Sequence, residues 1–279
     1  MKKTLKRILI FIIVFSIFIA AVAFDSYINI DVTHYDIKSD KLTKNYKIML
    51  LTDLHNRDVT DKIYDIYKNE NPDFIVMSGD MTNERIENGY THFFELCNKL
   101  KDKPIYYVFG NHEENMTDER QNKYIKEVED KTNVTLLNNK VLELEDNFVI
   151  YGFSHQVKYY LASTKEKLDE QYIIDRIGDI DKSKYNLLIS HDPLLYDLYS
   201  NIGYDSVLSG HVHGGVINIP FVGGLLSPDF TFFPKYYKGD NVFDKTHVVI
   251  SRGLGFGYMM PIRLFNRGEV VIINLMKNE

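Results

Sequence analysis

Five short motifs in the sequence contain side chains of the types that bind metal ions in enzymes. In chain order they are Asp53-Leu54-His55, Gly79-Asp80, Gly110-Asn111-His112-Glu113, Ser190-His191 and Gly210-His211-Val212-His213. A ligand set that mixes imidazole nitrogens with carboxylate and amide oxygens suits Mn, Fe, Zn, Co or Ni better than it suits calcium, which prefers oxygen ligands only. Cys97 is the only cysteine, so a thiolate-rich zinc site and an intramolecular disulfide are excluded, and we interpret Cys97 as a packed core residue.

Two of the motifs repeat one spacing. Residues two apart in an extended segment point to the same side of the backbone. On that geometry Asp53 and His55 could hold one ion together, and His211 and His213 would present two imidazoles on the same side. We therefore expect each pair to lie on one face of an extended segment.

The remaining motifs add different functions. Asp80 has two oxygens that could bridge two cations, and the glycine before it allows a tight backbone turn. Asn111 offers an amide oxygen beside His112, whose imidazole could donate a proton. With His191 as a further imidazole, the motifs predict a site with room for two ions.

A short apolar run, rich in β-branched or aromatic residues, precedes each motif and is typical of a buried strand. The runs are Lys47–Leu51, Phe74–Met77, Ile105–Phe109, Leu187–Ile189 and Val207–Leu208. Helix-length stretches at Asp58–Asn69 and Tyr90–Leu100 separate the early runs, and this alternation predicts an α/β fold. Open α/β sheets bind ligands beyond the carboxyl ends of their strands, which is where these motifs fall.

The later sequence predicts a second sheet. Val141–Leu144 and Phe148–Tyr151 flank Glu145-Asp146-Asn147 and indicate a hairpin, so the sheet should be mixed. In the C-terminal third, His247–Ile250 and Val270–Leu275 are further strand candidates, which we expect to add a sheet packed on the first. The predicted architecture is a two-sheet β-sandwich with helices outside.

The N-terminal segment predicts a contact with lipid. Lys2, Lys3, Lys6 and Arg7 precede an uncharged run at Ile8–Phe24. This run is long enough for a transmembrane helix, so we predict a signal anchor over residues 1–25. The alternative is a secretory signal cleaved after Ala21-Val22-Ala23. In both cases the basic flank stays in the cytoplasm and the rest of the chain lies outside it.

Composition limits the domain count and the partners. The chain has 279 residues, 44% of them hydrophobic and 26% charged, which fits one sizeable domain. We expect a linker and a first strand over residues 26–45 and a catalytic domain over 46–279. The net charge of -6, with no long basic block beyond the first residues, argues against nucleic acid as a partner. The oligomeric state has no signature in the sequence.

The ordered succession DLH, GD, GNHE, SH and GHVHGG resembles the calcineurin-like metallophosphoesterase family over roughly residues 45 to 275. The resemblance implies the four-layer α/β/β/α fold of that family, a phosphoester substrate and two divalent metal ions, with manganese the first expectation. Ser251–Gly255 and Pro261–Phe265 also resemble the membrane-anchored bacterial branch of the family, whose best-understood relatives cleave UDP-2,3-diacylglucosamine.

The same resemblance implies a role for each motif residue. Asp53, His55 and His213 would bind one metal, and Asn111, His191 and His211 the other. Asp80 would bridge both ions. His112 would be the general acid that protonates the leaving group.

Two departures from the branch leave the substrate open. Val216 stands where a glutamine commonly follows the double glycine, and Asn266–Glu269 replaces a proline-rich turn. We expect neither change to contact a metal ligand. The ligand set serves monoesters, diesters and pyrophosphates alike. A substrate on a lipid or another envelope phosphate would suit the membrane anchor.

Other residues could contact the substrate or simply pack. Gly214 and Gly215 would allow close approach to phosphate or would end a strand. Arg252 and Arg263 would hold a second phosphate or form ordinary salt bridges. The aromatic segment Phe230–Tyr237 would border an acyl pocket, lie at a lipid interface or pack in the core, and His155 would line the pocket or pack.

Two other functions fit the same sequence. A membrane sensor that binds a ligand without turnover would keep the fold, although the intact Asp80, Asn111 and His112 favour an enzyme. A phosphoprotein phosphatase would share the chemistry but would require an open groove.

Overall fold

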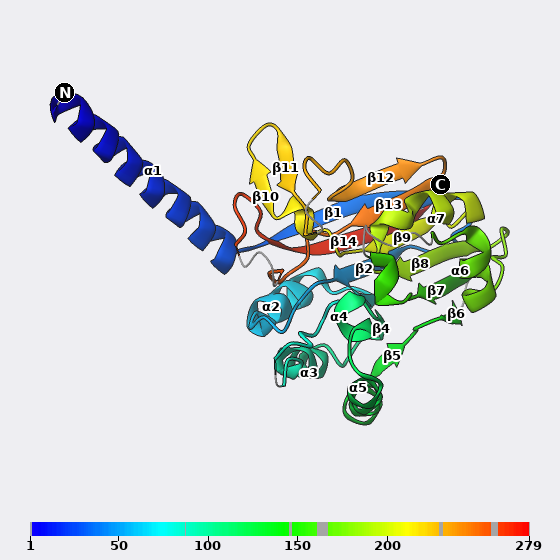
Figure 1. Ribbon diagram of the computed structural model, residues 1–279. Helices are drawn as coiled ribbons and strands as arrows, with labels where there is room; N and C mark the ends of the chain where they lie inside the picture. The colour runs from blue at the N-terminus through cyan, green and yellow to red at the C-terminus, as the bar shows by residue number, and fades with distance from the viewer. Residues whose placement is uncertain are drawn as a thin grey trace.

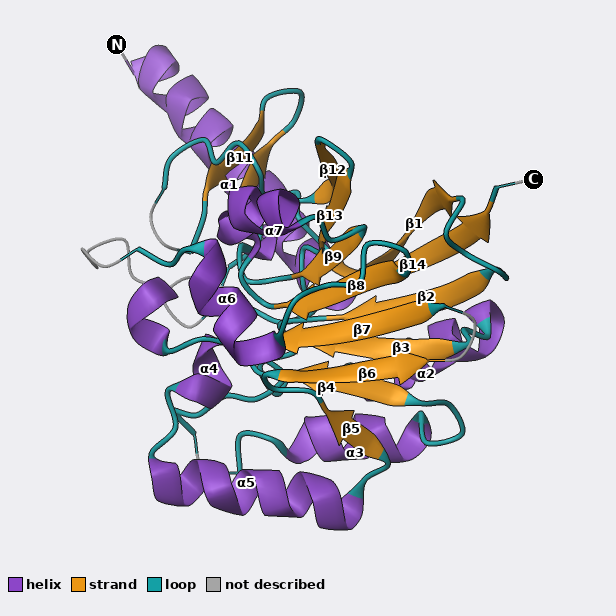
Figure 2. Cartoon of the chain, turned by 90° about the vertical axis from the view of Figure 1, so that its right-hand side faces the viewer, coloured by secondary structure: helices purple, strands orange, loops and turns teal. Residues whose placement is uncertain are grey.

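The computed structural model describes residues 2–86, 88–144, 147–160, 167–228, 231–257 and 262–278. Two six-stranded sheets form the centre of the molecule, with helices on their outer faces (Figure 1, Figure 2). The predicted turn residues Glu145 and Asp146, together with Phe230 and Pro261, lie outside the described residues.

Sheet A carries the first three motifs. Its strand order is β1 (Ile30–Ser39), β14 (Gly268–Lys277), β2 (Tyr46–Leu51), β3 (Phe74–Ser78), β4 (Ile105–Val108) and β5 (Val134–Leu136). Neighbours are parallel except β14 and β2. The outer face is covered by α2 (Thr60–Glu70), α3 (Thr91–Lys99) and α5 (Asp118–Lys131), which pack in one apolar cluster with sheet A side chains such as Met77 and Tyr107.

Sheet B carries the other two motifs. Its order is β12 (Gly239–Phe243), β13 (Thr246–Ile250), β9 (Ser206–Ser209), β8 (Tyr185–Ser190), β7 (Phe148–Phe153) and β6 (Lys140–Leu144). The two outermost pairs, β12 with β13 and β6 with β7, are antiparallel, and the inner strands are parallel. Helices α6 (Glu170–Ile177) and α7 (Tyr196–Ile202) pack on its outer face.

Apolar residues between the two sheets join them into a sandwich. Ile48 and Phe74 of sheet A pack in one buried cluster with Phe148 and Leu187 of sheet B. Every residue of β3, β7 and β8 is buried, because both faces of each sheet are covered. Two sheets between two layers of helices confirm the predicted α/β sandwich.

One part of the topology prediction is wrong. The second sheet is not an addition from the C-terminal third, because β6 to β9 already form most of it. Of the two C-terminal strand candidates, β13 joins sheet B, whereas β14 inserts into sheet A between β1 and β2. An apolar strand can pair with any open edge, so its residue pattern alone does not select the sheet.

Two elements project from the sandwich on the same side (Figure 1). Helix α1 spans Lys2–Ile28, and it is the helix in the described part of the chain that is long and apolar enough to cross a membrane. An uncleaved anchor and a secretory signal both have this form. Strands β10 (Ile217–Ile219) and β11 (Gly223–Leu226) form a separate antiparallel hairpin.

Candidate metal centre

The five predicted motifs meet at one edge of the sandwich. The loops after β2 and β3 bring Asp53, His55 and Asp80, and the short helix α4 (Asn111–Glu114) that follows β4 brings Asn111 and His112, all from sheet A. The segments after β8 and β9 bring His191, His211 and His213 from sheet B. Three groups of three ligand atoms each lie within 4.8 Å of one another: Asp53, His55 and His213; His55, Asp80 and His112; Asp80, His191 and His211. The carboxylates of Asp53 and Asp80 are almost completely buried.

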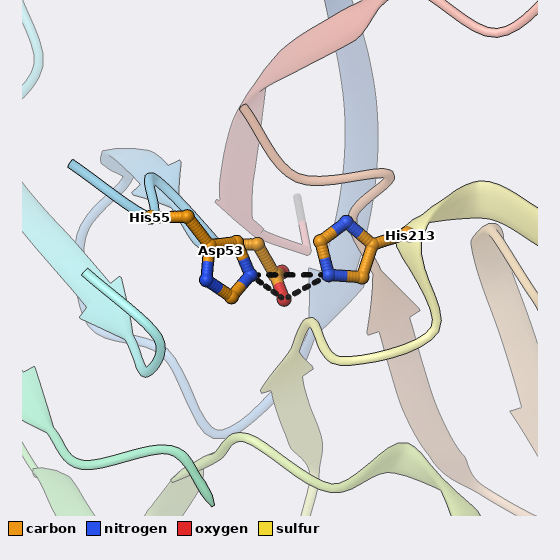
Figure 3. A group of neighbouring side chains, drawn as sticks. All are labelled: Asp53, His55 and His213. Carbon is orange, nitrogen blue, oxygen red and sulfur yellow. Dashed lines mark hydrogen bonds and ion pairs between the residues drawn. The ribbon is translucent and has the colours of Figure 1, made fainter. Parts of the chain in front are cut away.

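The first group joins the two sheets (Figure 3). The Nε2 atoms of His55 and His213 are 3.2 Å apart, and Asp53 Oδ1 lies 3.4 Å from His213 Nε2 and 3.9 Å from His55 Nε2. Figure 3 shows both rings turned toward the carboxylate. Burial, followed by the positive charge of His112, lowers the pKa of His55 to about 3, so its imidazole is neutral and able to bind a cation.

Asp80 belongs to both of the other groups. Its Oδ2 lies 3.2 Å from His191 Nε2, 3.8 Å from His55 Nε2 and 3.9 Å from His112 Nε2. Burial alone would raise the pKa of Asp80, but the charges of His191 and His112 outweigh it and hold the pKa well below its usual range. One ionised carboxylate therefore lies between imidazoles of both sheets.

Asn111 and His211 meet across the sheets. Asn111 Oδ1 lies 2.9 Å from His211 Nδ1. The backbone N–H of His211 lies 3.2 Å from each carboxylate oxygen of Asp53, so the sheet B loop is attached to a sheet A side chain. All seven residues predicted as ligands therefore fall in one cluster.

The backbone at the site differs from the expected extended segments. Positive φ angles between 48° and 70° occur at Asp53, His55, Asp80, His211 and His213. The prediction that the Asp53–His55 and His211–His213 pairs lie on one face of an extended segment is therefore wrong, because the chain turns at each residue. Aspartate and histidine tolerate the left-handed region better than most residues do, and strained backbone of this kind is concentrated at functional sites.

The donor set fits a metal centre. His191 Nδ1 donates to the Ser78 carbonyl at 2.7 Å, which directs Nε2 toward the carboxylates, 3.2 Å from Asp80 Oδ2. Metal-binding histidines are commonly oriented in this way by a backbone carbonyl on the other nitrogen. Burial raises the pKa of Asp53 to about 6, as does the charge of Asp80. Cations would stabilise both carboxylates at this depth.

His112 is fixed beside the ligand cluster by a carboxylate. Its Nδ1 is hydrogen-bonded to Glu84, and its ring centroid lies 4.5 Å from that of His55. Burial would lower the pKa of His112, but the charge of Asp80 and the hydrogen bond to Glu84 raise it to about 9. Glu84 had no signal in the sequence, because it stands in a loop outside every motif.

Glu113 supports the turns that carry the candidate ligands. It belongs to the Asn111 motif, but no role for it was predicted from the sequence. Its side chain is completely buried. One oxygen accepts from the backbone N–H groups of Asp80 and Gly110, each at 2.8 Å, and the other accepts from the N–H and hydroxyl of Thr82. Four donors thus fix the turns that present Asp80 and Asn111.

Glycines at the strand ends allow this close packing. A Cβ atom at Gly79 would lie within 3.0 Å of the His191 ring, and one at Gly110 would lie within 3.0 Å of the Asp80 carboxylate. Gly79 also has a φ of 79°, which side chains disfavour. A larger residue at either position would displace a candidate ligand.

Gly214 and Gly215, two of the candidate substrate-binding residues, pack closely against other residues of the chain. Gly214 and Gly215 have positive φ angles; a Cβ at Gly214 would meet Arg252 and Asn266, and one at Gly215 would meet Gly224 and Tyr237. Each of these glycines thus accommodates a close contact within the fold.

The two candidate arginines, Arg252 and Arg263, form ion pairs or hydrogen bonds with other residues of the chain. Arg252 Nη2 lies 3.0 Å from carboxylate oxygens of both Asp31 and Glu269. Arg263 is 2% exposed; its Nε donates to the Gly255 carbonyl and its Nη2 lies 3.1 Å from His213 Nδ1. Arg263 therefore contacts the His213 imidazole on the side opposite to the nitrogen that faces Asp53 and His55.

The departure at Asn266 does contact a candidate ligand, contrary to expectation. The buried Asn266 Nδ2 donates to the carbonyls of His213 at 2.8 Å and Val216 at 3.1 Å. Asn266 is 53 residues beyond His213, so no local pattern indicates the contact.

The structure also shows where His155 and the described part of the aromatic segment lie. His155 is buried, with its ring stacked 4.2 Å from that of Tyr160, which in turn lies 4.9 Å from the His211 ring. In the described part of the aromatic segment, Tyr236 packs against the outer core of sheet B. Phe232 and Phe233 are 67% and 60% exposed.

The comparisons with known proteins agree with this geometry. A family model described as calcineurin-like phosphoesterase matches residues 46–215, which include every candidate metal ligand. The chain belongs to the calcineurin-like phosphoesterase family. Its relatives carry names such as metallophosphoesterase and phosphodiesterase, and the chain is a metal-dependent phosphoester hydrolase.

Several bacterial proteins and a solved structure are similar to this chain. An uncharacterized metallophosphoesterase of Campylobacter jejuni is 28% identical over 276 residues, which cover 95% of this chain and 68% of that protein. The phosphodiesterase YaeI of Escherichia coli is 26% identical over 238 residues, covering 83% of this chain and 82% of YaeI. The chain spans only 62% of each of two similar Helicobacter pylori metallophosphoesterases. Among solved structures, TT1561 of Thermus thermophilus matches 75% of this chain and 89% of its own, with 11% identity and a TM-score of 0.47.

Proposed function

We propose that this phosphoesterase uses a dinuclear metal centre to hydrolyse a phosphoester at the outer face of a membrane. The supporting observation is the position of the Asp80 carboxylate, which faces imidazoles from both sheets. Asp53, His55 and His213 would hold one ion, Asn111, His191 and His211 would hold the other, and Asp80 would contribute to both. When bound, the two cations supply Lewis-acid chemistry for the phosphate oxygens and the attacking water.

His112 acts as the general acid. Its Nδ1 is bonded to Glu84, which leaves Nε2 facing the ligand cluster 3.9 Å from Asp80 Oδ2. As the bond between phosphorus and the leaving oxygen breaks, the proton on Nε2 passes to that oxygen. Glu84 keeps the imidazole oriented and stabilises its protonated form.

Helix α1 anchors the enzyme and sets the class of substrate. Its basic N-terminal flank is the end that stays in the cytoplasm, so the catalytic domain, over residues 46–279, lies outside. An anchored hydrolase meets substrates in or beside the bilayer, and we assign it a lipid-linked or envelope phosphoester. Equal turnover of soluble and vesicle-bound phosphoesters by the anchored enzyme would count against this assignment.

The test of the reaction uses the full chain in detergent, stripped of metal and then supplied with manganese, acting on nitrophenyl mono- and diesters. Manganese should restore hydrolysis. Asp80→Ala should abolish it, and His112→Ala should lower kcat by about 10²- to 10⁴-fold. His92→Ala is the matched control, because His92 lies on α3 and pairs with Glu95 away from the cluster.

A folded chain that stays inactive with Mn, Fe, Zn, Co and Ni would contradict the proposal and indicate a ligand sensor. Faster turnover of phosphoserine peptides than of any lipid phosphoester would instead identify a protein phosphatase.

A further inference from the structure

The hairpin that follows the metal-binding histidines exposes apolar side chains. Residues 212 to 228 contain no Asp, Glu, Lys or Arg, and the turn between β10 and β11 presents Phe221 and Val222, the latter 64% exposed and the former fully exposed. Exposed apolar residues lie on this hairpin and on the two segments beside it. We call this set the apolar ridge: Ile219, Phe221, Val222, Phe232, Phe233, Ile262 and Phe265.

Hydrogen bonds join these segments into one surface. The N–H of Asn218 in β10 donates to the Leu264 carbonyl, which places Phe265 beside the hairpin. On the other side, the Phe233 N–H donates to the Leu225 carbonyl of β11. A hollow lined by Ile219, Phe221, Val222 and Phe265 lies within the ridge. The exposed side chains are therefore continuous over three adjoining segments.

The ridge is continuous with helix α1. The Phe265 ring lies 6.1 Å from that of Phe18, and Phe265 also lines a crevice of about 430 Å³ with Ala21 and Val22. Figure 1 shows the hairpin and α1 projecting on the same side of the sandwich. Beyond the apolar run, Asp25 forms a two-point ion pair with Arg267.

The rise of helix α1 gives an estimate of how deep in the bilayer the ridge lies. The apolar run of α1 ends at Phe24, six residues after Phe18. At 1.5 Å of rise per residue, Phe18 lies about 9 Å inside the end of the run. Apolar faces of interfacial elements insert about 5 to 10 Å into the boundary between headgroups and acyl chains. A bilayer that contains the whole run therefore reaches Phe265 as well.

We propose that the apolar ridge inserts into the outer leaflet of the bilayer that α1 crosses, as a second membrane contact of the enzyme. This inference rests on α1 being an uncleaved anchor, as in the proposed function. The exposed Lys235 and Lys238 flank the ridge and would face lipid phosphates. Because β10 begins directly after the turn that carries His213, the ridge fixes how the metal centre faces the membrane.

The test uses the absence of tryptophan from the chain, which makes a single introduced tryptophan a specific probe. The full-length variants Phe221→Trp and Phe233→Trp are reconstituted in vesicles with or without lipids brominated on their acyl chains. Bromine quenches only indoles that reach the acyl region, so we expect brominated lipid to lower the emission of both variants clearly below that of the control. Val141→Trp is the control, because Val141 is 45% exposed on β6, far from α1 (Figure 1).

Phe15→Trp, in the middle of α1, reports insertion of the anchor itself. Quenching of this probe without quenching of Phe221→Trp beyond the Val141→Trp level would overturn the ridge proposal and leave the anchor intact. Protection of Phe221→Trp from aqueous acrylamide without bromine quenching would overturn it in favour of a protein partner or a second copy. Hydrolysis of nitrophenyl esters in the same vesicles tests the enzymatic proposal separately.

Discussion

The two sheets make unlike contributions to the metal centre. Sheet A supplies both carboxylates, the amide and the imidazoles of His55 and His112. The turns after β3 and β4 are fixed locally by Glu113, which lies in the Asn111 motif itself. Sheet B supplies only imidazoles, and these are held by other parts of the chain. His191 donates to Ser78 of sheet A, and the His213 carbonyl accepts from Asn266 near the C-terminus.

This difference implies an order of assembly. The turns that carry Asp80 and Asn111 can form as β3 and β4 pair, because Glu113 is near in sequence, whereas the Asp53 loop also accepts hydrogen bonds from the later segment at Leu254 and Gly255. The sheet B half becomes ordered only when the sandwich closes and the C-terminal segment is in place. The following substitutions separate the two halves.

Glu113→Gln should have the largest effect, because it acts on the sheet A half. The amide group would replace an oxygen that accepts two hydrogen bonds, leaving two buried donors unpaired. We expect the free energy of unfolding to fall by about 3 kcal/mol and metal affinity to fall with it, as measured by urea denaturation and metal titration. Glu119→Gln, on the exposed face of α5, should change neither. Unchanged stability in Glu113→Gln would remove the argument for local support.

Asn266→Ala tests the sheet B half and should have a smaller effect. It removes the donor to the His213 and Val216 carbonyls, at a cost of about 2 kcal/mol in the free energy of unfolding. The matched control is Asn241→Ala, since Asn241 Nδ2 also donates to two carbonyls, those of Lys238 and Gly239. Only Asn266→Ala should lower kcat/KM at saturating manganese. Equal kcat/KM in both variants would separate Asn266 from the positioning of His213.

The two halves should also differ in the protons they release on metal binding. Burial would lower the pKa of His191, but the charges of Asp80 and Asp53 raise it to about 10, so the metal-free imidazole is protonated at pH 7. His55, with its pKa lowered to about 3, is already neutral. A cation must displace the His191 proton, so the binding constant should rise about tenfold per pH unit between pH 7 and 9.

Calorimetry in buffers with different ionisation enthalpies measures this release. About one proton per chain should come from His191, so His191→Ala should lose it and His55→Ala should keep it. Release that survives His191→Ala and disappears in His55→Ala would reverse the comparison.

Sequence patterns predicted the parts of the molecule that depend on local features. A buried strand followed by a polar loop has a recognisable pattern, which is why the strands and all seven candidate ligands were found. Glu84 and Asn266 were missed because their roles depend on contacts across the fold, and neither residue differs in type from an ordinary loop residue. The left-handed backbone at His55 and His213 was also missed, since both residues are compatible with extended structure.

The pairing of β1 with β14 has a consequence for synthesis of the chain. Ile30 lies opposite Gly268, and Ser39 lies opposite Lys277, so the first strand of the chain pairs with the last. Strand β14 also separates β1 from β2, and sheet A cannot be completed until nearly the whole chain has left the ribosome. During synthesis β1 therefore stays without its partner strand while all the residues between Ser39 and Gly268 are made, and this edge of the sheet closes last.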